Sequence, residues 1–348
     1  MRAHRQSSSR PTLSTYFKNP SLQASLFGTN LSPKAVSPMT IRIGHLSDIH
    51  VPALEPFSLR DLFSKRITGF LNFKWKREKE YHLDVLKNAI DRLITADVDA
   101  VIVSGDLSNL AYEREFQAAF DLLQPLSHAD IPWFVIPGNH DRYLRSAIDG
   151  RMERIFAKQL GDPLSNTDVY PWIKELPDAV LIGLNSAVPT PPFQAWGVVS
   201  EDQLDALRSH KERILQIGKP IVLAVHHHIG KAPHKKNDHN RNLRNSDEVM
   251  RLCEELGVKL VLHGHNHFLD IQQLQDVRVF AASSGISNQS GVHRTAGQVA
   301  IHQLEAYGAI THEVAFWEGD TFGPWRAITS ETLPPRPNAL PAQARTVT

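Results

Sequence analysis

Five short apolar runs in this 348-residue chain each end in a cluster of polar side chains that can bind metals or transfer protons. Apolar runs of this length, bounded by Gly and polar residues, are typical of buried strands. In open α/β sheets the ligand site lies outside the carboxyl ends of the strands, where residues far apart in the sequence meet. We therefore expect one cleft lined by residues 47–50, 104–106, 138–141, 226–228 and 263–267.

The apolar runs alternate with segments in which apolar residues recur at helical spacing, a pattern typical of α/β folds. This pattern predicts strands over residues 41–46, 100–103, 133–136, 180–184, 221–225 and 259–262. The final third differs, because residues 277–282, 298–304 and 309–316 are predicted strands without long helices between them. Such consecutive strands favour an antiparallel portion or a second sheet. We expect one domain without internal repeats.

The polar clusters contain enough donors for two metal ions. Asp48 and His50 are separated by one residue, and in an extended backbone residues i and i+2 point the same way. His265 and His267 repeat this spacing. Each motif alone is more typical of a turn or a cap, but their joint occurrence after apolar strands favours a metal site. The candidate ligands, too many for one tetrahedral ion, are Asp48, His50, Asp106, Asn139, His226, His265 and His267.

The chemistry of these donors indicates which metal ions they bind. Nitrogen and oxygen ligands without cysteine indicate Mn, Fe, Zn or Co rather than a thiolate-bound structural zinc. Two such ions about 3.5–4 Å apart bind a phosphate, polarise phosphorus and turn a bridging water into hydroxide for in-line attack. The ligand set therefore predicts two divalent metal ions as cofactor, which can bind a phosphate group.

The motifs D-x-H, G-D, G-N-H-D, H and G-H-x-H, in this order over about residues 41–270, resemble those of the calcineurin-like metallophosphoesterases. The resemblance implies a four-layer α/β/β/α sandwich of two mixed sheets with a dinuclear metal site. It also implies that the first histidine after its strand, His226 rather than His227, is a ligand. One ion is then held by Asp48, His50, Asp106 and His267, and the other by Asp106, Asn139, His226 and His265, so that Asp106 bridges the two ions.

The same resemblance assigns two catalytic residues. His140 is expected to contact the phosphate and to help the leaving group depart, which requires an imidazole that donates a proton near neutral pH. Asp141, the next residue, is expected to orient this imidazole.

Differences from other branches of the family disfavour two classes of phosphatase. A protein Ser/Thr phosphatase is expected to continue G-D with x-x-D-R-G, but residues 107–110 read Leu-Ser-Asn-Leu. Purple acid phosphatases have an iron-binding tyrosine at the position of Asn109. The remaining resemblance is to the bacterial-type phosphodiesterase branch, which includes cyclic-nucleotide, glycerophosphodiester and lipid-linked pyrophosphate hydrolases. The His-His-Pro-Pro of many members is His-His-His-Ile at residues 226–229, which leaves the substrate open.

We therefore predict a phosphodiesterase that acts on a cyclic nucleotide or on another small or lipid phosphodiester. A phosphomonoesterase with the same metal site is the main alternative. A non-catalytic interaction module is a further alternative, but the loss of ligands expected of such a module has not occurred at any of the seven positions. A nuclease is disfavoured because residues 268–326 are too short for an added DNA-binding domain.

Composition excludes other classes. The chain has 38 Lys and Arg against 37 Asp and Glu, so its net charge of +1 does not favour a nucleic-acid partner. No apolar run approaches the roughly 18 residues of a membrane span. Cys253 is the single cysteine and cannot form an internal disulfide, which fits a reducing compartment such as the cytoplasm.

The two ends of the chain are expected to be disordered. Residues 1–38 contain no Asp or Glu, are rich in Ser and show no hydrophobic period. They resemble an organelle transit peptide, but Met39 directly precedes the first strand and would serve as a start, so we favour a non-structural extension. Residues 39–326 are expected to form the metallophosphoesterase domain, and the Pro-rich residues 327–348 a disordered tail.

Two basic segments adjoin the expected site. Residues 55–80 combine basic and aromatic side chains and form a candidate lid. Residues 57–79 either touch an acyl chain, an anionic lipid surface or a base, or simply pack a surface helix on the sandwich, which we favour. Residues 231–245 either hold the substrate or form a solvated charge run.

Overall fold

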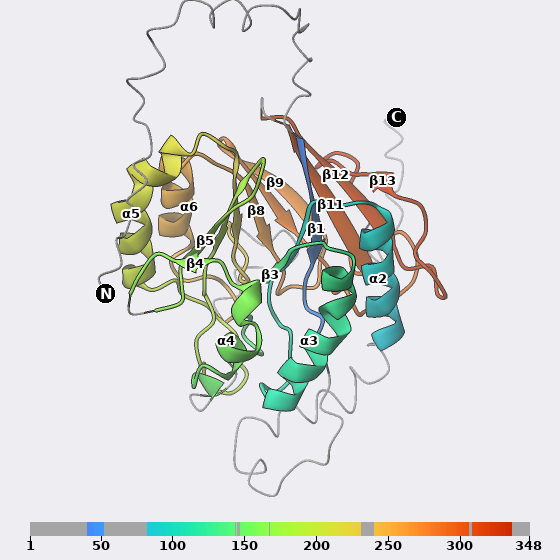
Figure 1. Cartoon of the computed structure of the whole chain (residues 1–348). Coiled ribbons are helices and arrows are strands. Elements are labelled where there is room, and N and C mark those ends of the chain that lie inside the picture. The colour runs from blue at the N-terminus through green and yellow to red at the C-terminus, as the bar shows by residue number, and fades with distance from the viewer. Residues whose placement is uncertain are drawn as a thin grey trace, which may run out of the picture. The chain divides into compact units, whose positions relative to one another are not determined.

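Two mixed β-sheets pack face to face at the centre of the domain (Figure 1). The structure is a computed structural model that describes residues 40–51, 82–142, 144, 147–166, 168–230, 240–305 and 308–335. All of these belong to the unit Met39–Thr348. The strand order is β13-β12-β11-β1-β2-β3 in the first sheet and β4-β5-β6-β7-β8-β10-β9 in the second.

The strands are short and the helices lie between them in the sequence. The first sheet contains β1 (Thr40–Leu46), β2 (Ala100–Val103), β3 (Trp133–Val135), β11 (Gln298–Glu305), β12 (Ile310–Phe316) and β13 (Arg326–Ala327). The second contains β4 (Asp162–Pro163), β5 (Trp172–Glu175), β6 (Val180–Gly183), β7 (Ile221–Ala224), β8 (Val258–His263), β9 (Asp270–Leu274) and β10 (Val277–Ala281). The helices are α2 (Leu83–Thr95), α3 (Glu113–His128), α4 (Arg151–Ile155), the 3₁₀ turn η6 (Ala157–Gln159), α5 (Glu201–Gln216) and α6 (Ser246–Glu255).

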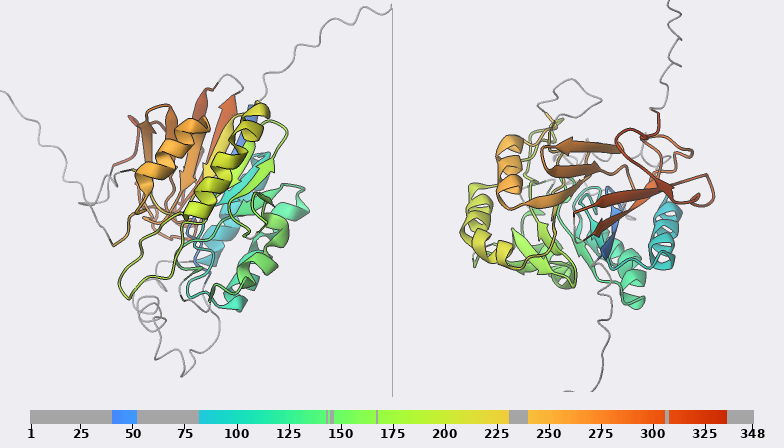
Figure 2. Two further views of the ribbon diagram at one scale, coloured as in Figure 1. Left: turned by 90° about the vertical axis from the view of Figure 1, so that its left-hand side faces the viewer. Right: turned by 90° about the horizontal axis from the view of Figure 1, so that it is seen from above.

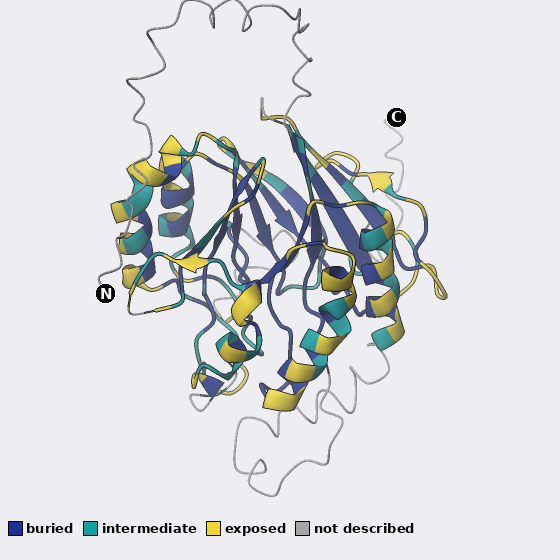
Figure 3. Cartoon of the chain, viewed as in Figure 1, coloured by how far each residue is buried: buried dark blue, intermediate teal, exposed yellow. Residues whose placement is uncertain are grey.

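Alternating side chains on the strands divide the core into three layers, because successive residues of a strand point to opposite faces. On β2, Ala100 and Ile102 pack between the sheets, whereas Val101 and Val103 pack with α2 and α3. Strand β7 alternates in the same way between the inter-sheet core and the layer of α5 and α6. The fold is thus the expected four-layer α/β/β/α sandwich (Figure 2). Figure 3 shows the buried strands inside and the exposed helix faces outside.

Helices α2 and α3 form for identifiable local reasons. In α2 the buried residues, Val85, Leu86, Ala89, Ile90 and Leu93, recur at helical spacing and form one apolar face. At the start of α3, the Glu115 carboxylate accepts hydrogen bonds from the backbone N of Leu110 at 2.8 Å and of Tyr112 at 3.0 Å. It thereby satisfies amide groups that the helix itself leaves without a partner.

Parallel strands carry the predicted clusters to one edge of the sandwich. Strands β1, β2 and β3 are parallel neighbours in the first sheet, as are β6, β7, β8 and β10 in the second. Backbone hydrogen bonds join the loops beyond the strand ends: Gly264 N donates to His226 O at 3.2 Å, and Gly285 N to Ser47 O at 2.9 Å. The topology therefore brings these loops together.

Most predicted strands agree with the structure to within a residue at each end. The apolar pattern does not identify β4, β5, β9 or α4, because these elements are short or carry polar residues. Strand β12 is antiparallel to both β11 and β13, and β9 is antiparallel to β10, which confirms the antiparallel portion expected in the final third.

The packed chain continues beyond residue 326, where we expected the domain to end. Ala327 belongs to β13, and Ile328 is buried in the inter-sheet core with its N donating to His312 O at 2.9 Å. Arg294 Nε donates to Pro334 O at 2.9 Å. Prolines therefore do not prevent residues 327–334 from packing, since a chain without long regular structure can still bury side chains.

Some predictions fall on residues that the structure does not describe. These are the leader of residues 1–38, the basic aromatic insert of residues 55–80, the stretch 231–239 of the second basic segment, and the tail beyond residue 335. Within the described ranges, no helix combines the length and the apolar character needed to cross a membrane.

Candidate metal centre

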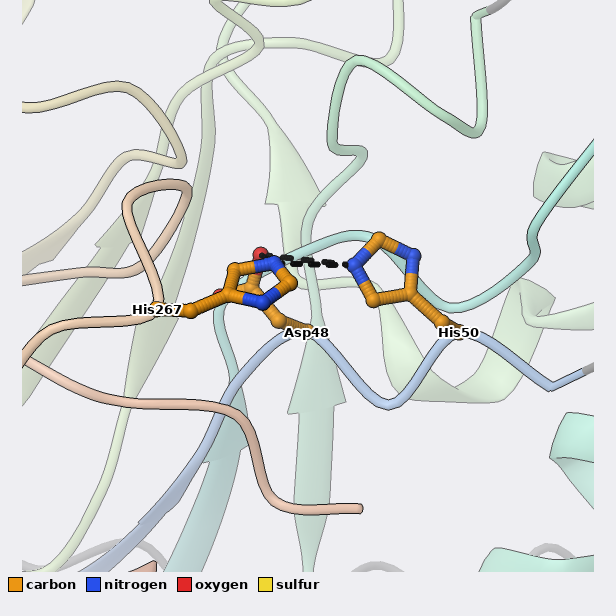
Figure 4. A group of neighbouring side chains, drawn as sticks. All are labelled: Asp48, His50 and His267. Carbon is orange, nitrogen blue, oxygen red and sulfur yellow. Dashed lines mark hydrogen bonds and ion pairs between the residues drawn. The ribbon is translucent and has the colours of Figure 1, made fainter. Parts of the chain in front are cut away.

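Three of the predicted ligands meet beyond the end of β1 (Figure 4). Asp48 and His50 follow β1, and His267 lies in the loop after β8. His267 Nε2 lies 3.1 Å from Asp48 Oδ1 and 3.0 Å from His50 Nε2. His50 Nε2 lies 3.8 Å from Asp48 Oδ1. Donor atoms around one ion, with bonds of about 2.0–2.2 Å, have similar separations.

A second set of predicted ligands surrounds the amide oxygen of Asn139, in the loop after β3. This Oδ1 atom lies 2.8 Å from His265 Nδ1 and 3.2 Å from His226 Nε2. The two imidazole rings are 5.2 Å apart at an angle of 75°. An oxygen and two ring nitrogens, from loops after three different strands, therefore converge on one point.

Asp106, in the loop after β2, joins the two sets through one oxygen atom. Its Oδ2 lies 3.6 Å from His50 Nε2 and 3.4 Å from His226 Nε2. Its other oxygen, Oδ1, accepts a hydrogen bond from His140 N at 2.8 Å. The carboxylate thus stands between the two sets, where a bridging ligand is expected.

Backbone strain is concentrated at these residues. The candidate ligands Asp48, His50, Asp106, His265 and His267 all have positive φ, between 37° and 72°. Non-glycine residues rarely adopt this region, and they persist there where the surrounding structure holds them, as at functional sites. The sequence-based argument that Asp48 and His50 share a side because the chain is extended is therefore wrong in its geometry. Left-handed residues bring the two side chains together instead.

Two glycines permit close approach to the carboxylates. A Cβ atom at Gly138 would overlap Oδ1 and the backbone N of Asp106. One at Gly264 would overlap Ser47 Oγ and Asp48 Oδ2. These positions require glycine because the loops contact each other there.

The segment that carries the whole site, residues 41–269, matches the family model described as calcineurin-like phosphoesterase. The match covers about two thirds of the chain. The chain belongs to this family. It is accordingly a metallophosphoesterase, a hydrolase of phosphoester bonds, as the motifs predicted.

Curated relatives of this phosphoesterase include two that are named probable cyclic nucleotide phosphodiesterase. The one from Ruthia magnifica subsp. Calyptogena magnifica is 26% identical over 184 residues, which are 52% of this chain and 68% of the relative. The one from Psychrobacter arcticus is 24% identical over 206 residues, which are 58% of this chain and 67% of the relative.

Solved structures share the fold of this phosphoesterase. A dimetal phosphatase from Danio rerio superposes with a TM-score of 0.52 at 13% identity, covering 84% of this chain and 99% of that chain. GAP50, described as the anchor in the inner membrane complex of Plasmodium, superposes with a TM-score of 0.51 at 12% identity, covering 84% and 91%. At these identities the likeness shows the fold alone.

Hydrogen bonds distinguish His226 from the neighbouring His227 in the phosphoesterase site. His226 Nδ1 donates to Ser104 O at 2.8 Å, which turns Nε2 toward the other candidate ligands. Metal-binding histidines are commonly held in this way through their second ring nitrogen. His227 Nδ1 instead lies 2.8 Å from Ser186 Oγ. The geometry therefore favours the first histidine after β7, as the resemblance implied.

Asp141 makes contacts other than the predicted one. Its carboxylate accepts hydrogen bonds from Gly138 N at 2.9 Å and from the N and Oγ of Ser108, both at 2.8 Å. It thereby ties the loop after β3 to the loop after β2. The imidazole of His140 is oriented by Asn109 O, 2.7 Å from Nδ1. Asp141 thus positions the loop, and a carbonyl group positions the ring.

The charges of the site fit a metal centre. Asp48 and Asp106 are 0% and 1% exposed. Burial by itself would raise their pKa values, but His267 beside Asp48 and His226 beside Asp106 hold both pKa values below the usual range. At His226 burial lowers the pKa, yet these carboxylates outweigh it and raise the pKa to about 9. Two buried carboxylates thus require adjacent positive charge, which divalent cations supply.

His265 is held in the form that a metal ligand needs. Burial first, and the neighbouring His227 second, keep the pKa of His265 well below its usual value. The ring is therefore neutral, and a neutral imidazole is the species that coordinates metals. Its Nε2 atom is buried and has no hydrogen-bond partner among the described residues.

Two serines after β10 support the site, and the sequence did not predict their role. Ser284 Oγ donates to Asp48 O at 2.7 Å, and Ser283 Oγ to His267 O at 3.2 Å. These bonds hold the backbone of two candidate ligands. No sequence signal identifies such a contact, because every residue type has a carbonyl group that can accept it.

Proposed function

We propose that this phosphoesterase hydrolyses phosphodiesters with two divalent metal ions held by the seven predicted ligands. The observation that carries the proposal is the position of Asp106 Oδ2, within 3.6 Å of an imidazole from each set. One ion would be bound by Asp48, His50, Asp106 and His267, and the other by Asp106, Asn139, His226 and His265. The nitrogen and oxygen donors suit Mn, Fe, Zn or Co.

Two ions bound there would polarise the phosphoryl group and lower the pKa of water toward neutral pH. The chain itself supplies a positioned proton donor. His140 packs edge-on against His50 at a ring distance of 4.7 Å, and its backbone N is fixed on Asp106. With Nδ1 directed at Asn109 O, Nε2 is the atom that would donate a proton to the departing oxygen.

The names of the two curated relatives support a diester, including a cyclic nucleotide, as the substrate class. Another small diester or a lipid diester fits the same metal chemistry. Contact with a membrane surface through the basic and aromatic residues 57–79 is a further proposal.

The first test compares bis-p-nitrophenyl phosphate with p-nitrophenyl phosphate as substrates of the full chain in Mn²⁺. We expect a higher kcat/KM for the diester, dependent on the added metal. Asn139→Ala is expected to lower this activity at least about 100-fold, because it removes a ligand of one ion. A preference for the monoester would instead support a phosphomonoesterase, and inactivity with every divalent metal would reject the proposal.

His140→Ala is expected to lower kcat by about 10²–10⁴-fold, the usual contribution of a positioned general acid. The metal content should stay at the wild-type value, because no ion depends on this imidazole in the proposed ligand sets. Metal analysis and steady-state kinetics on the same preparation separate the two effects. Undiminished kcat, or loss of metal in parallel with activity, would contradict the role of His140 as acid.

A further inference from the structure

A buried ion pair adjoins the loop that carries Asn139 and His140. Arg142, the second residue after His140, forms an ion pair with Glu153 of α4. The side chains of Arg142 and Glu153 are only 5% and 13% exposed. Surface ion pairs contribute little to structure, but a buried pair that loses one partner leaves an uncompensated charge in the interior. Arg142 and Glu153 are therefore strongly constrained to stay together.

Glu153 lies on a helix that is packed firmly into the core. Helix α4 is anchored by Met152 and by Phe156 directly after it, both buried in the core beneath the first sheet. The ring of Phe156 packs against Phe120 at 5.7 Å and against Trp133 at 6.1 Å. Trp133 begins β3, the strand that ends at the loop of His140. Through Phe156 and Glu153, this segment thus contacts both the start of β3 and the residues beyond its end.

The Arg142 end belongs to a tight turn. Arg142 N donates to Gly138 O at 3.3 Å, and Asp141 N donates to the same oxygen at 3.1 Å. On the other side of the turn, His140 N donates to Asp106 Oδ1. A displacement of Arg142 is therefore transmitted through this turn to His140, and it is opposed by the contacts on the Asp106 side.

Both side chains of the pair also have a buried polar atom without another partner among the described residues. Arg142 Nε and Glu153 Oε2 are buried without hydrogen-bond partners among the described residues, and so is the hydroxyl of Tyr170. The pKa of Tyr170 is raised, first by the burial of its side chain and second by the nearby negative charge of Glu153. The bond between the two charged groups is thus the main compensation for their burial.

We propose that the Arg142–Glu153 ion pair positions the His140 imidazole against the leaving group of the substrate. Both are positioning residues, since they act through His140 and touch neither the substrate nor the proposed metal ligands. This inference rests on the proposed function. Acid catalysis depends steeply on position, because a proton donor displaced by about 1 Å loses much of its effect.

The test uses leaving groups that differ in their need for a proton. Bis-p-nitrophenyl phosphate releases a weakly basic phenolate that departs without help, whereas diphenyl phosphate releases a more basic one. Glu153→Gln is expected to lower kcat for diphenyl phosphate by about 10–100-fold but kcat for the nitrophenyl ester by less than about 3-fold. KM and metal content should remain at their wild-type values. His140→Ala supplies the reference pattern for a lost acid.

Two further variants separate positioning from general damage. Asp149→Asn removes the partly exposed ion pair with Arg151 at the start of the same helix, and should leave both rates unchanged. Glu153→Asp keeps the charge and should restore much of the rate with diphenyl phosphate. Thermal melting checks that each variant is folded.

The outcomes are distinct. Equal losses with both esters in Glu153→Gln, or no loss with either, would overturn the positioning role while wild-type activity still upheld the proposed function. A wild-type enzyme inactive on both diesters would reject the proposed function itself.

Discussion

Asp106→Asn is expected to release both metal ions and to lower kcat/KM for phosphodiesters by about 10³-fold or more. The reason is that Asp106 Oδ2 lies within 3.6 Å of His50 Nε2 and 3.4 Å of His226 Nε2, so one oxygen serves both sets of ligands. A neutral amide removes the negative charge that each ion needs. Lewis-acid stabilisation of several kcal/mol is then lost, at about 1.4 kcal/mol for each factor of ten. Metal analysis after gel filtration, with kinetics on the same sample, measures both effects.

Asp48→Asn is the matched control for this experiment. Asp48 is also a buried carboxylate, but the imidazoles that it contacts are those of His50 and His267, both in the first set, and its contact with His265 of the second set is to the backbone N. We expect this variant to lose one metal equivalent per chain and to retain the other. Retention of two equivalents by Asp106→Asn would contradict the bridging role, and equal loss in both variants would show that the sets do not bind independently.

The place of the site was predictable from the sequence because its chemistry coincides with strand ends. Asp106 and His226 follow strands that are apolar throughout, β2 and β7, and such strands are recognisable without any partner. Parallel strands then have to present their carboxyl ends at one edge. The meeting of residues that are 120 positions apart follows from this rule alone.

The local geometry of the ligands was not predictable, because contacts between distant loops create it. The left-handed conformation of Asp48 coexists with a hydrogen bond from Ser284, 236 residues away in the sequence. Neither residue type signals this contact. The same holds for Glu153, which lies on the five-residue helix α4 and has no periodic pattern around it that would predict its pairing with Arg142.

No pattern in the sequence connects the three histidines that lie between the sheets. His302 Nδ1 lies 2.8 Å from His312 Nδ1, and His302 Nε2 lies 3.3 Å from His45 Nδ1. His45 Nε2 continues the chain to Ser104 Oγ at 2.8 Å. All three histidines are at most 2% exposed. Each of the three lies on a different strand, and only the pairing of β1, β11 and β12 brings them together.

This histidine chain is held in the neutral state. Burial lowers the pKa of His45 to about 3, against the opposing effect of Asp48 and with a smaller effect of His312 in the same direction. Burial and the charge of Arg278 lower the pKa of His312 to about 3, and burial with its two histidine neighbours holds the pKa of His302 well below its usual value. In the unfolded chain the three rings titrate near pH 6.5.

The protein is therefore expected to lose stability steeply as the pH falls from 7 to 5. Below about pH 6.5 the unfolded chain binds protons that the folded chain excludes, so the free energy of unfolding decreases by about 1.4 kcal/mol per pH unit for each such histidine. At pH 5 the three rings together would lower the free energy of unfolding by about 6 kcal/mol. This is a large part of the free energy of unfolding typical of a folded protein, about 5–15 kcal/mol.

His302→Gln tests this source of acid sensitivity, because glutamine can donate and accept hydrogen bonds but does not titrate. Urea unfolding at a series of pH values should show a slope of stability against pH that is smaller than wild type by about 1.4 kcal/mol per pH unit between pH 6 and 5. His82→Gln, at the exposed residue before α2, is the matched control and should keep the wild-type slope. Because both variants retain every proposed metal ligand, protons taken up by the metal centre cancel in the comparison. A wild-type slope in His302→Gln would show that the buried chain of histidines does not make the fold sensitive to acid.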